Sequence, residues 1–326
     1  MSSENGFFRV LVTGAGTGSA VSVIKSLKRQ NEIPLEIIAV DSDPLSAGLF
    51  LADFGHEIPN VDEPDYIRKL IDICKKYEVT VIFPTFSKEI LEISKKQSLL
   101  RENGIESLLP KPEVIAKCDN KRDMYDFVSN LGIPVPKEFD VKDFESARIG
   151  GLEFPLFVKP NISSGSKGVN LVNNFGELEI IPFVEEDYIL QEYFPGPEYT
   201  VDVLVDEEHK LLVASPRVRL SVKAGQMVKG ETREIPILRE YCELICKEIG
   251  AVGPGNIQFF EDRGSFIFSE YNPRFAAGGL MLTIEAGADI PLLALKLCLG
   301  IKAVPEKLKH NLTMIRYYEE VFSSRE

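Results

Sequence analysis

The chain has 326 residues, of which 44% are hydrophobic and 27% charged, and its net charge is −13 at pH 7. This length suits roughly two domains, and the acidic balance argues against broad binding to nucleic acid or anionic membranes. Because no apolar run reaches about 20 residues, the N-terminus lacks the features of a secretory signal and the five cysteines are scattered, we expect a soluble, cytoplasmic protein.

The first hundred residues alternate strand-like and helix-like patterns. A buried strand is predicted over Phe7–Thr13, a helix over Ser19–Lys28, and a second strand over Leu35–Val40. Such alternation predicts a mostly parallel sheet with helices on both faces. The later elements continue the pattern: helix Asp65–Tyr77, strand Val79–Phe83, helix Ser87–Lys96 and a short strand at Ser107–Leu109.

A glycine-rich turn, Gly14–Gly18, joins the first strand to the first helix. Its backbone N–H groups would lie at a helix N-terminus, where an anion binds well. Asp41 ends the second strand, within the range of a ribose-binding acid, although Ser19 replaces the third glycine of the dinucleotide fingerprint. A nicotinamide-dependent oxidoreductase or epimerase is therefore one hypothesis, and an ordinary turn of a doubly wound sheet is the other.

Polar residues follow the strand that ends at Phe83. Thr85 and Ser87 lie just beyond it, at the carboxyl edge where parallel sheets bind ligands. Ser87 also stands directly before a helical pattern, and we favour a role as its N-cap.

A proline-rich stretch, Pro110–Pro112, marks a domain boundary. Helices are predicted over Pro112–Cys118 and Asn120–Leu131, and a strand over Phe154–Pro160 carries Lys159 near its end. The Ser163–Gly168 loop that follows is rich in small residues. It could close over phosphates as a lid, although such stretches are commonly plain loops.

The last part of the chain predicts a further sheet. Strand Tyr188–Tyr193 is expected to pair antiparallel with Glu198–Val205 across a Pro-Gly-Pro turn. Strand Leu211–Leu220 continues this meander, and Ser221–Arg233 is predicted as a polar loop. The remaining elements are a helix over Ile235–Ile249, a helix within Thr283–Leu299 and an edge strand over Thr313–Glu320.

A hairpin is predicted over Asn256–Arg274, with its turn at Gly264. Pairing of its strands brings Gln258, Glu270 and Asn272 together on one face, directly before Arg274. Carboxylate and amide oxygens beside a guanidinium suit Mg²⁺ and phosphate. The simpler interpretation is an amphipathic hairpin with a polar end.

Taken together, these segments resemble the ATP-grasp superfamily, in particular its carbamoyl-phosphate-synthase-like branch. The resemblance implies an α/β plus α+β architecture, the ATP-grasp fold preceded by a Rossmann-like pre-ATP-grasp domain. It places that domain at residues 1–110, a lid subdomain at 111–190 and a C-terminal subdomain with the metal site at 191–326.

The resemblance also implies residue roles. Lys121 and Lys159 match phosphate-contacting positions, and Glu198 matches the acid that accepts from ribose hydroxyls. Arg274 matches the arginine that stabilises the acyl phosphate, with Lys159 and Asn272 beside it in catalysis. The other implied positions are the lid (Ser164, Gly165, Ser166, Gly168), the adenine-contacting hinge (Glu192, Tyr193, Phe194) and the metal ligands (Gln258, Glu270, Asn272).

The activity implied is an ATP- and Mg²⁺- (or Mn²⁺-) dependent ligation of a small-molecule carboxylate to an amine, giving ADP and phosphate. Gln258 stands where an acid is common, which leaves open whether one or two metals bind. A non-catalytic nucleotide-binding subunit is the alternative, and a homodimer is the commonest symmetric assembly to test. Candidate substrate-cleft residues are Gly14–Gly18, Thr85–Ser87, Arg217, Arg219, Lys223 and Gly278–Gly279.

Overall fold

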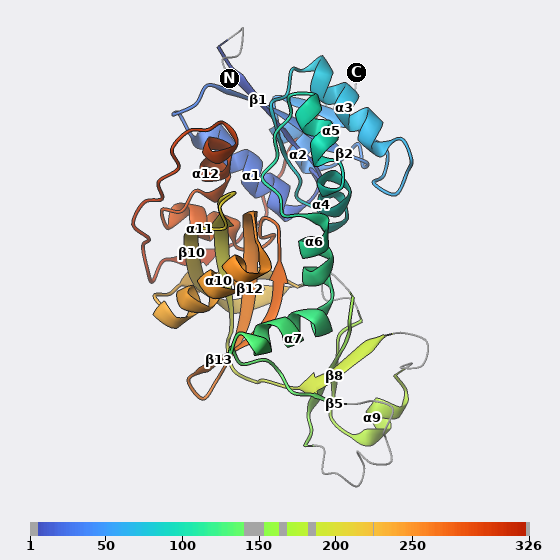
Figure 1. The fold of residues 1–326 in the computed structure, drawn as a ribbon, viewed down its shortest axis with the longest axis vertical. Coiled ribbons are helices and arrows are strands. Elements are labelled where there is room, and N and C mark those ends of the chain that lie inside the picture. Colours follow the sequence, from blue (N-terminus) through green and yellow to red (C-terminus); the bar gives the residue numbers. More distant parts are fainter. Residues whose placement is uncertain (1–5, 140–152, 163–167, 182–186, 224, 324–326) are drawn as a thin grey trace.

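A computed structural model of the chain describes residues 6–139, 153–162, 168–181, 187–223 and 225–323. Three parts follow one another along the long axis of the molecule: an N-terminal sheet with its helices, a six-stranded sheet, and a small four-stranded sheet at the far end (Figure 1). None of the helices in these ranges has the length and apolar character needed to cross a membrane.

The N-terminal sheet is parallel and has the strand order β3-β2-β1-β4. Successive residues of its central strand point to opposite faces: Val10 and Val12 belong to one buried cluster, and Leu11 belongs to another. This two-sided burial explains the nearly continuous apolar run that predicted the strand. The elements are β1 (Phe8–Val12), α1 (Gly18–Arg29), β2 (Leu35–Asp41), α2 (Ala47–Leu51), β3 (Phe54–Glu57), α3 (Tyr66–Lys76), β4 (Val81–Phe83), α4 (Ser87–Ser94) and α5 (Gln97–Glu102).

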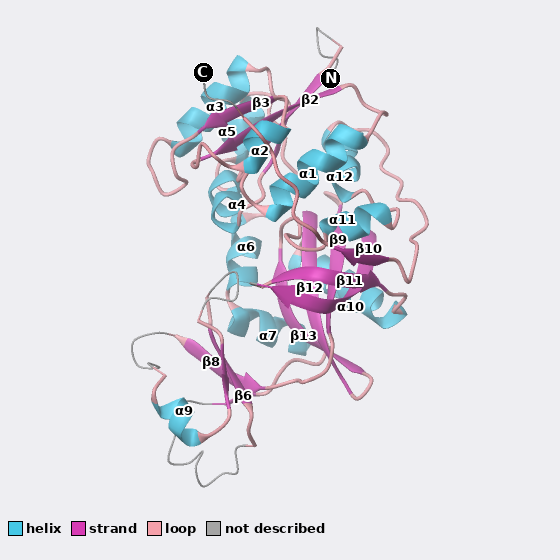
Figure 2. Ribbon diagram, turned by 180° about the vertical axis from the view of Figure 1, so that it is seen from behind, coloured by secondary structure: helices cyan, strands magenta, loops and turns pink. Residues whose placement is uncertain are grey.

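The six-stranded sheet is antiparallel, in the order β13-β12-β9-β10-β11-β14. Helix α10 lies across one face (Figure 1), whereas α11 and α12 lie on the other side of the sheet, toward α1 (Figure 2). Its elements are β9 (Glu198–Val205), β10 (Leu211–Lys223), β11 (Gln226–Thr232), α10 (Pro236–Ile249), β12 (Gly253–Asp262), β13 (Ser265–Asn272), α11 (Leu280–Glu285), α12 (Ile290–Cys298) and β14 (Thr313–Ile315).

Alternate side chains of strand β9 point into a buried core on one face and toward a cavity on the other. Val201 and Val203 pack with α10 in a buried cluster, and the alternate residues Thr200 and Asp202 point to the opposite face. Glu198 and Thr200 line the cavity described below. The period-two alternation of this strand therefore supplies both the core and the polar wall.

The small sheet has the order β5-β8-β6-β7, and two helices join it to the rest of the chain. The second of these, α7, packs on the six-stranded sheet through Tyr125, whose ring meets Phe268 edge-to-face at 6.2 Å between centroids. The elements are α6 (Pro112–Asp119), α7 (Lys121–Asn130), β5 (Glu138–Phe139), β6 (Leu156–Pro160), β7 (Asn170–Val172), α9 (Phe175–Glu179) and β8 (Tyr188–Glu192).

The predicted pairing of strand 188–193 with strand 198–205 is wrong. Strand β8 pairs with β5 and β6, whereas β9 pairs with β10 and β12 in the other sheet. The Pro195–Pro197 turn therefore carries the chain from one sheet to the next. Short loop length favoured a hairpin, but the pairing of β8 with β6 satisfies its backbone groups instead.

Two further predictions need correction. Residues 221–223 and 226–232 are not a loop, because β10 continues to Lys223 and β11 pairs with it and with β14. The many polar side chains of this segment led to the loop prediction. The segment Ser107–Leu109 forms no strand, since the one described pairing there is a bridge from Glu106 to Val81. The helix expected within 283–299 is confirmed as α12, and α11 precedes it across Gly287, whose φ is +106°.

Phe268 offers a test of the core beneath the hairpin. It is fully buried and contacts Phe259 and Tyr125, so Phe268→Ala should lower the free energy of unfolding by about 3–5 kcal/mol. Phe322→Ala, at a side chain that is 90% exposed, should change it by less than about 0.5 kcal/mol. Urea denaturation measures both, and equal midpoints for the two variants would contradict this packing.

Candidate active site

One cavity of about 330 Å³ lies where the two antiparallel sheets and α7 come together. Its cationic walls come from β6, β10, the start of α7 and the segment after β13. The described lining residues include five cationic side chains and two carboxylates: Lys121, Lys159, Arg217, Arg219 and Arg274, with Glu198 and Glu270.

The predicted hairpin is confirmed and forms one wall of this cavity. Gln258 pairs in register with Glu270, and Asn272 lies two residues further along the same face. All three line the cavity. The Asn272 Nδ2 donates to Glu270 Oε1 at 2.9 Å, so the hairpin holds these groups together without any ligand.

Arg274 joins the hairpin to the N-terminal domain. Its Nε donates to Ser87 Oγ at 3.1 Å, its NH2 to Asn272 Oδ1 at 3.3 Å and its NH1 to the Phe275 carbonyl at 3.2 Å. Burial lowers the pKa of Arg274, and the charges of Glu270 and Asp119 oppose that effect. The guanidinium is therefore fixed in place from both domains.

The predicted N-cap role of Ser87 is wrong. Phe86 is the cap residue of α4, Ser87 is the first helical residue, and the helix has no side-chain cap. The Ser87 hydroxyl instead accepts the bond from Arg274. A preference for serine at caps could not foresee an arginine 187 residues away.

Two buried lysines face the hairpin from the other side. Lys159 is 5% exposed, and its Nζ donates to the Tyr125 hydroxyl at 2.7 Å. Burial lowers the pKa of Lys159 to about 8, although the charge of Glu270 opposes the shift. Burial also lowers the pKa of Lys121, whose Nζ donates to the Asn161 carbonyl at 3.1 Å. Both amines lie in a setting that favours binding of an anion.

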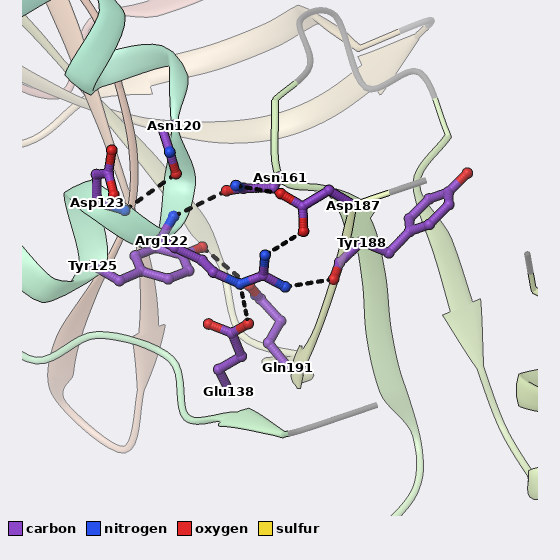
Figure 3. Close-up of polar contacts among 9 residues, drawn as sticks. All are labelled: Asn120, Arg122, Asp123, Tyr125, Glu138, Asn161, Asp187, Tyr188 and Gln191. Carbon is purple, nitrogen blue, oxygen red and sulfur yellow. Dashed lines mark hydrogen bonds and ion pairs between the residues drawn. The ribbon is translucent and has the colours of Figure 1, made fainter. Parts of the chain in front are cut away.

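A polar network surrounds Arg122, the residue after Lys121 (Figure 3). From α7, Arg122 donates to Glu138, to Asp187 and to the Tyr188 carbonyl, which ties the helix to β5 and β8. Asn161 bridges the Arg122 backbone and Asp187. The small sheet, and Lys159 on it, are thus held at a defined place relative to α7.

Sequence reasoning missed this network and the support of Lys159. The Tyr125 hydroxyl accepts from Lys159 and donates to Gln191 Oε1 at 3.0 Å. Gln191 is a buried polar residue inside an apolar strand, at 1% exposure. Such a residue signals a required hydrogen-bond partner, but the sequence does not say which one.

The two arginines of β10 both reach the cavity, as their alternation predicts, but each already has a carboxylate partner. Arg217 forms a bidentate ion pair with Asp202, in which both N···O distances are 3.0 Å. Arg219 forms an ion pair with Glu198 and donates to the Gly225 carbonyl. Burial raises the pKa of Glu198, and Arg219 opposes this shift.

The hinge residues expected near a nucleobase lie behind the cavity wall. Phe157 and Phe260 line the cavity; Tyr193 stacks on Phe157 at 6.4 Å between centroids, and Phe194 stacks on Phe260 at 5.7 Å. Glu192 exchanges backbone and side-chain hydrogen bonds with Lys137, away from the lining. Phe157 and Phe260 are lining residues that the sequence did not single out.

The lid segment lies mostly beyond the described residues. Ser164, Gly165 and Ser166 fall in the undescribed range 163–167. Gly168 has φ of +74°, and a Cβ there would lie 2.8 Å from Pro160 Cγ, so this position requires glycine. Lys223 is exposed and absent from the described lining.

The N-terminal glycine turn packs against the segment that follows Arg274. A Cβ on Gly18 would lie 2.7 Å from the Ala277 carbonyl oxygen, which explains a glycine there. Asp41 accepts from the backbone N–H groups of Gly16 and Asp43, at 2.7 and 2.9 Å. The carboxylate that a nicotinamide ribose would need is therefore already bound to the turn, which disfavours the oxidoreductase hypothesis.

The hairpin donors fit a metal ion that arrives together with phosphates. No group of three acidic, histidine or cysteine side chains in the described ranges could hold a metal alone. The hairpin offers one carboxylate, Glu270, and the amide oxygens of Gln258 and Asn272. This set suits Mg²⁺, which usually binds one or two protein carboxylates and completes its coordination shell with phosphates and water. The lysines opposite would hold those phosphates.

Two family models match parts of the chain. Residues 184–320 match "ATP-grasp in the biosynthetic pathway with Ter operon", and residues 10–108 match "PylC-like, N-terminal domain". The predicted resemblance to the ATP-grasp superfamily is confirmed for the C-terminal part of the chain, and the predicted fold class is confirmed.

The chain is similar to the large chain of carbamoyl phosphate synthase. That of Haemophilus ducreyi is 24% identical over 327 residues, covering 89% of this chain and 30% of the relative. That of Clostridium perfringens is 25% identical over 313 residues, covering 89% and 28%. The chain thus spans less than a third of the length of these curated relatives.

Solved structures share the fold. The biotin carboxylase of Campylobacter jejuni has a TM-score of 0.74 at 20% identity, over 94% of this chain and 74% of that chain. N5-carboxyaminoimidazole synthetase of Staphylococcus aureus, complexed with ADP, has a TM-score of 0.72 at 18% identity, over 93% and 80%. The biotin carboxylase domain of Hydrogenobacter thermophilus 2-oxoglutarate carboxylase, with MgADP and bicarbonate, has a TM-score of 0.71 at 22% identity, over 94% and 73%.

The lowered pKa of Lys159 predicts a dependence of stability on pH. A lysine in the unfolded chain titrates near about 10.4, whereas Lys159 in the fold titrates at about 8. Between these values the unfolded state binds more protons, so the free energy of unfolding rises with pH. Relative to Lys159→Met, the wild type should gain up to about 3 kcal/mol across this window.

Denaturant unfolding at pH 7, 8, 9 and 9.5 measures this difference. Lys229→Met, at a lysine on β11 that does not line the cavity, serves as the control and should follow the wild-type slope. Parallel curves for the wild type and Lys159→Met would contradict the burial of a titrating Lys159.

Proposed function

We propose that this protein is an ATP- and Mg²⁺- (or Mn²⁺-) dependent ligase. It activates a carboxylate as an acyl phosphate and joins the acyl group to an amine, with release of ADP and phosphate. The observation that carries this proposal is that two buried lysines and Arg274 share one cavity with the Glu270 carboxylate and its neighbouring amides. Such a set suits phosphoryl transfer, which needs charge neutralisation and positioning more than covalent chemistry.

The placement of each group supports the residue roles that we propose. Lys121 and Lys159 hold phosphate oxygens as point charges, and Arg274 holds the planar oxygen set of the transferred phosphoryl group. Glu198, held by Arg219, accepts from ribose hydroxyls. Phe157 and Phe260 give the nucleobase an apolar wall, supported from behind by the rings of Tyr193 and Phe194.

The chemistry proceeds in two displacements. A carboxylate oxygen attacks the γ-phosphorus of ATP while the bond to ADP breaks. The amine nitrogen then attacks the acyl carbon, phosphate leaves, and the nitrogen loses a proton. A bound Mg²⁺, held by Glu270 with Asn272 and Gln258, would supply neutralisation of the triphosphate charge. Arg274 stabilises the negative charge of the acyl phosphate between the two steps.

We also propose that the chain is divided into three parts. Residues 1–110 form the pre-ATP-grasp domain, 111–190 the lid subdomain, with Ser164, Gly165, Ser166 and Gly168 in the lid, and 191–326 the C-terminal subdomain. The solved biotin carboxylase domain from Hydrogenobacter thermophilus is described as a dimer with MgADP, and we propose a homodimer here. Small-molecule substrates and a cytoplasmic location complete the proposal.

Glu270 is the ligand whose loss should matter most. Glu270→Gln keeps the side-chain volume but removes the one carboxylate of the hairpin donor set, so ATP turnover should fall by roughly 10²–10³-fold. Glu261→Gln, on the same hairpin but outside the described lining, should keep wild-type turnover. ADP release measures both, and a wild-type rate in Glu270→Gln would refute the metal assignment.

The function itself is tested by an ADP-release screen over pairs of carboxylic acids and amines, followed by mass spectrometry of the product. We expect ADP release that requires both an acid and an amine, and a product mass equal to their sum less one water. If the protein binds Mg-ATP but no pair stimulates ADP release, the alternative of a non-catalytic nucleotide-binding subunit gains support.

A further inference from the structure

The substrate end of the cavity contains an arginine that the proposed phosphoryl transfer does not use. Arg217 lines the cavity together with Met227, Gln226 and the Ala276–Gly278 segment that follows Arg274. It is 3% exposed, and its partner Asp202 is 1% exposed. The Arg217–Asp202 ion pair is therefore buried in the cavity wall.

The guanidinium is fixed before any ligand arrives. Its Nε and NH2 each bind one oxygen of Asp202 at 3.0 Å, and Asp202 also accepts from the Thr283 hydroxyl at 2.5 Å. A Cβ on Gly279 would lie 2.1 Å from Arg217 Cζ, so the chain has a glycine where the guanidinium needs room. Such a held planar fork loses little entropy when it binds an anion.

One nitrogen of Arg217 lacks an oxygen acceptor. Among the described residues, the hydrogen-bond partner of its NH1 is the sulfur of Met227 at 3.3 Å, and a thioether is a weak acceptor. Arg219 and Arg274, the other arginines of this cavity, differ: both terminal nitrogens of each donate to oxygen. A buried N–H edge without an oxygen partner favours a ligand that supplies one.

The neighbouring group also offers a donor. Gln226 lines the cavity, and its Oε1 accepts from Arg316 NH1 at 3.1 Å, which leaves its Nε2 as the group that can serve a ligand. The two carboxylates of the described lining lie elsewhere: Glu198 is paired with Arg219, and Glu270 is on the hairpin. The substrate end is therefore rich in donors and suits a ligand rich in acceptors.

We propose that Arg217 is a specificity-determining residue that binds a second carboxylate of the acid substrate, so that the enzyme ligates dicarboxylic acids in preference to monocarboxylic ones. This inference rests on the proposed ligase function and extends it. One carboxylate of the substrate lies by Arg274, where it is phosphorylated, and the other meets the NH1 edge of Arg217. The thioether of Met227 shields this edge until the substrate displaces it.

The test compares dicarboxylic acids of four to six carbons, including glutamate, with their monoamides of equal length. Each acid is assayed for ADP release with Mg-ATP and a mixed pool of amines. Binding of the same acids is measured by calorimetry with a non-hydrolysable ATP analogue. In the wild type we expect at least one diacid to exceed its monoamide by roughly 10- to 100-fold in kcat/KM and in affinity, the range for a charge-assisted hydrogen bond.

Two variants locate this preference. Arg217→Lys keeps the charge but removes the planar guanidinium, and Met227→Glu places a carboxylate against NH1 while leaving the Arg217–Asp202 pair intact. Met227→Leu, which adds no oxygen acceptor, is its apolar counterpart. Arg217→Lys and Met227→Glu should lose the diacid preference with a larger effect on KM than on kcat. Met227→Leu and Arg233→Lys, at a partly exposed arginine outside the cavity, should keep it. Thermal unfolding checks that each variant folds.

The outcomes separate this inference from the function on which it rests. If monocarboxylates turn over as well as diacids, if no diacid binds in calorimetry, or if folded Met227→Glu retains the preference, Arg217 is a structural residue only. If diacids bind and Met227→Glu abolishes that binding, yet no acid releases ADP, the recognition site stands and the ligase function fails.

Discussion

Five cationic side chains surround one cavity whose described walls contain two carboxylates. Burial opposes positive charge in such a place, and it lowers the pKa of Lys121, Lys159 and Arg274. Neutral acceptors, such as the Tyr125 hydroxyl and the Asn161 carbonyl, hold the lysines in the absence of an anion. A bound polyanion would neutralise this charge, and the architecture is best understood as the means of keeping these cations together.

The cations come from four segments of the chain, and specific contacts keep three of these segments in place. Arg122 ties α7 to the small sheet that carries Lys159 (Figure 3). Arg274 reaches Ser87 in the N-terminal domain, and Gly18 packs against the segment after Arg274. A substitution at Arg122, Ser87 or Gly18 would move a charge relative to the hairpin, even though none of these three residues lines the described cavity.

Local patterns in the sequence predicted much of this structure. The hairpin and the presence of both β10 arginines on one wall follow from period-two alternation. The parallel N-terminal sheet follows from the alternation of strand-like and helix-like segments. The assignment of β8 and β9 to separate sheets did not follow, because a short Pro-Gly-Pro turn is compatible with either arrangement. The acid partners of Arg217 and Arg219 were also missed, since ion pairs between strands depend on register, which the sequence pattern does not fix.

The central claim is that ATP phosphorylates a carboxylate in this cavity. Transfer of oxygen-18 tests it most directly: an acid found in the ADP-release screen is labelled in its carboxylate and incubated with Mg-ATP and its amine. An acyl phosphate requires that one labelled oxygen leave with the phosphate when the amine attacks, so mass spectrometry should find phosphate carrying one oxygen-18. Released phosphate without the label, alongside formation of the amide, would contradict the account.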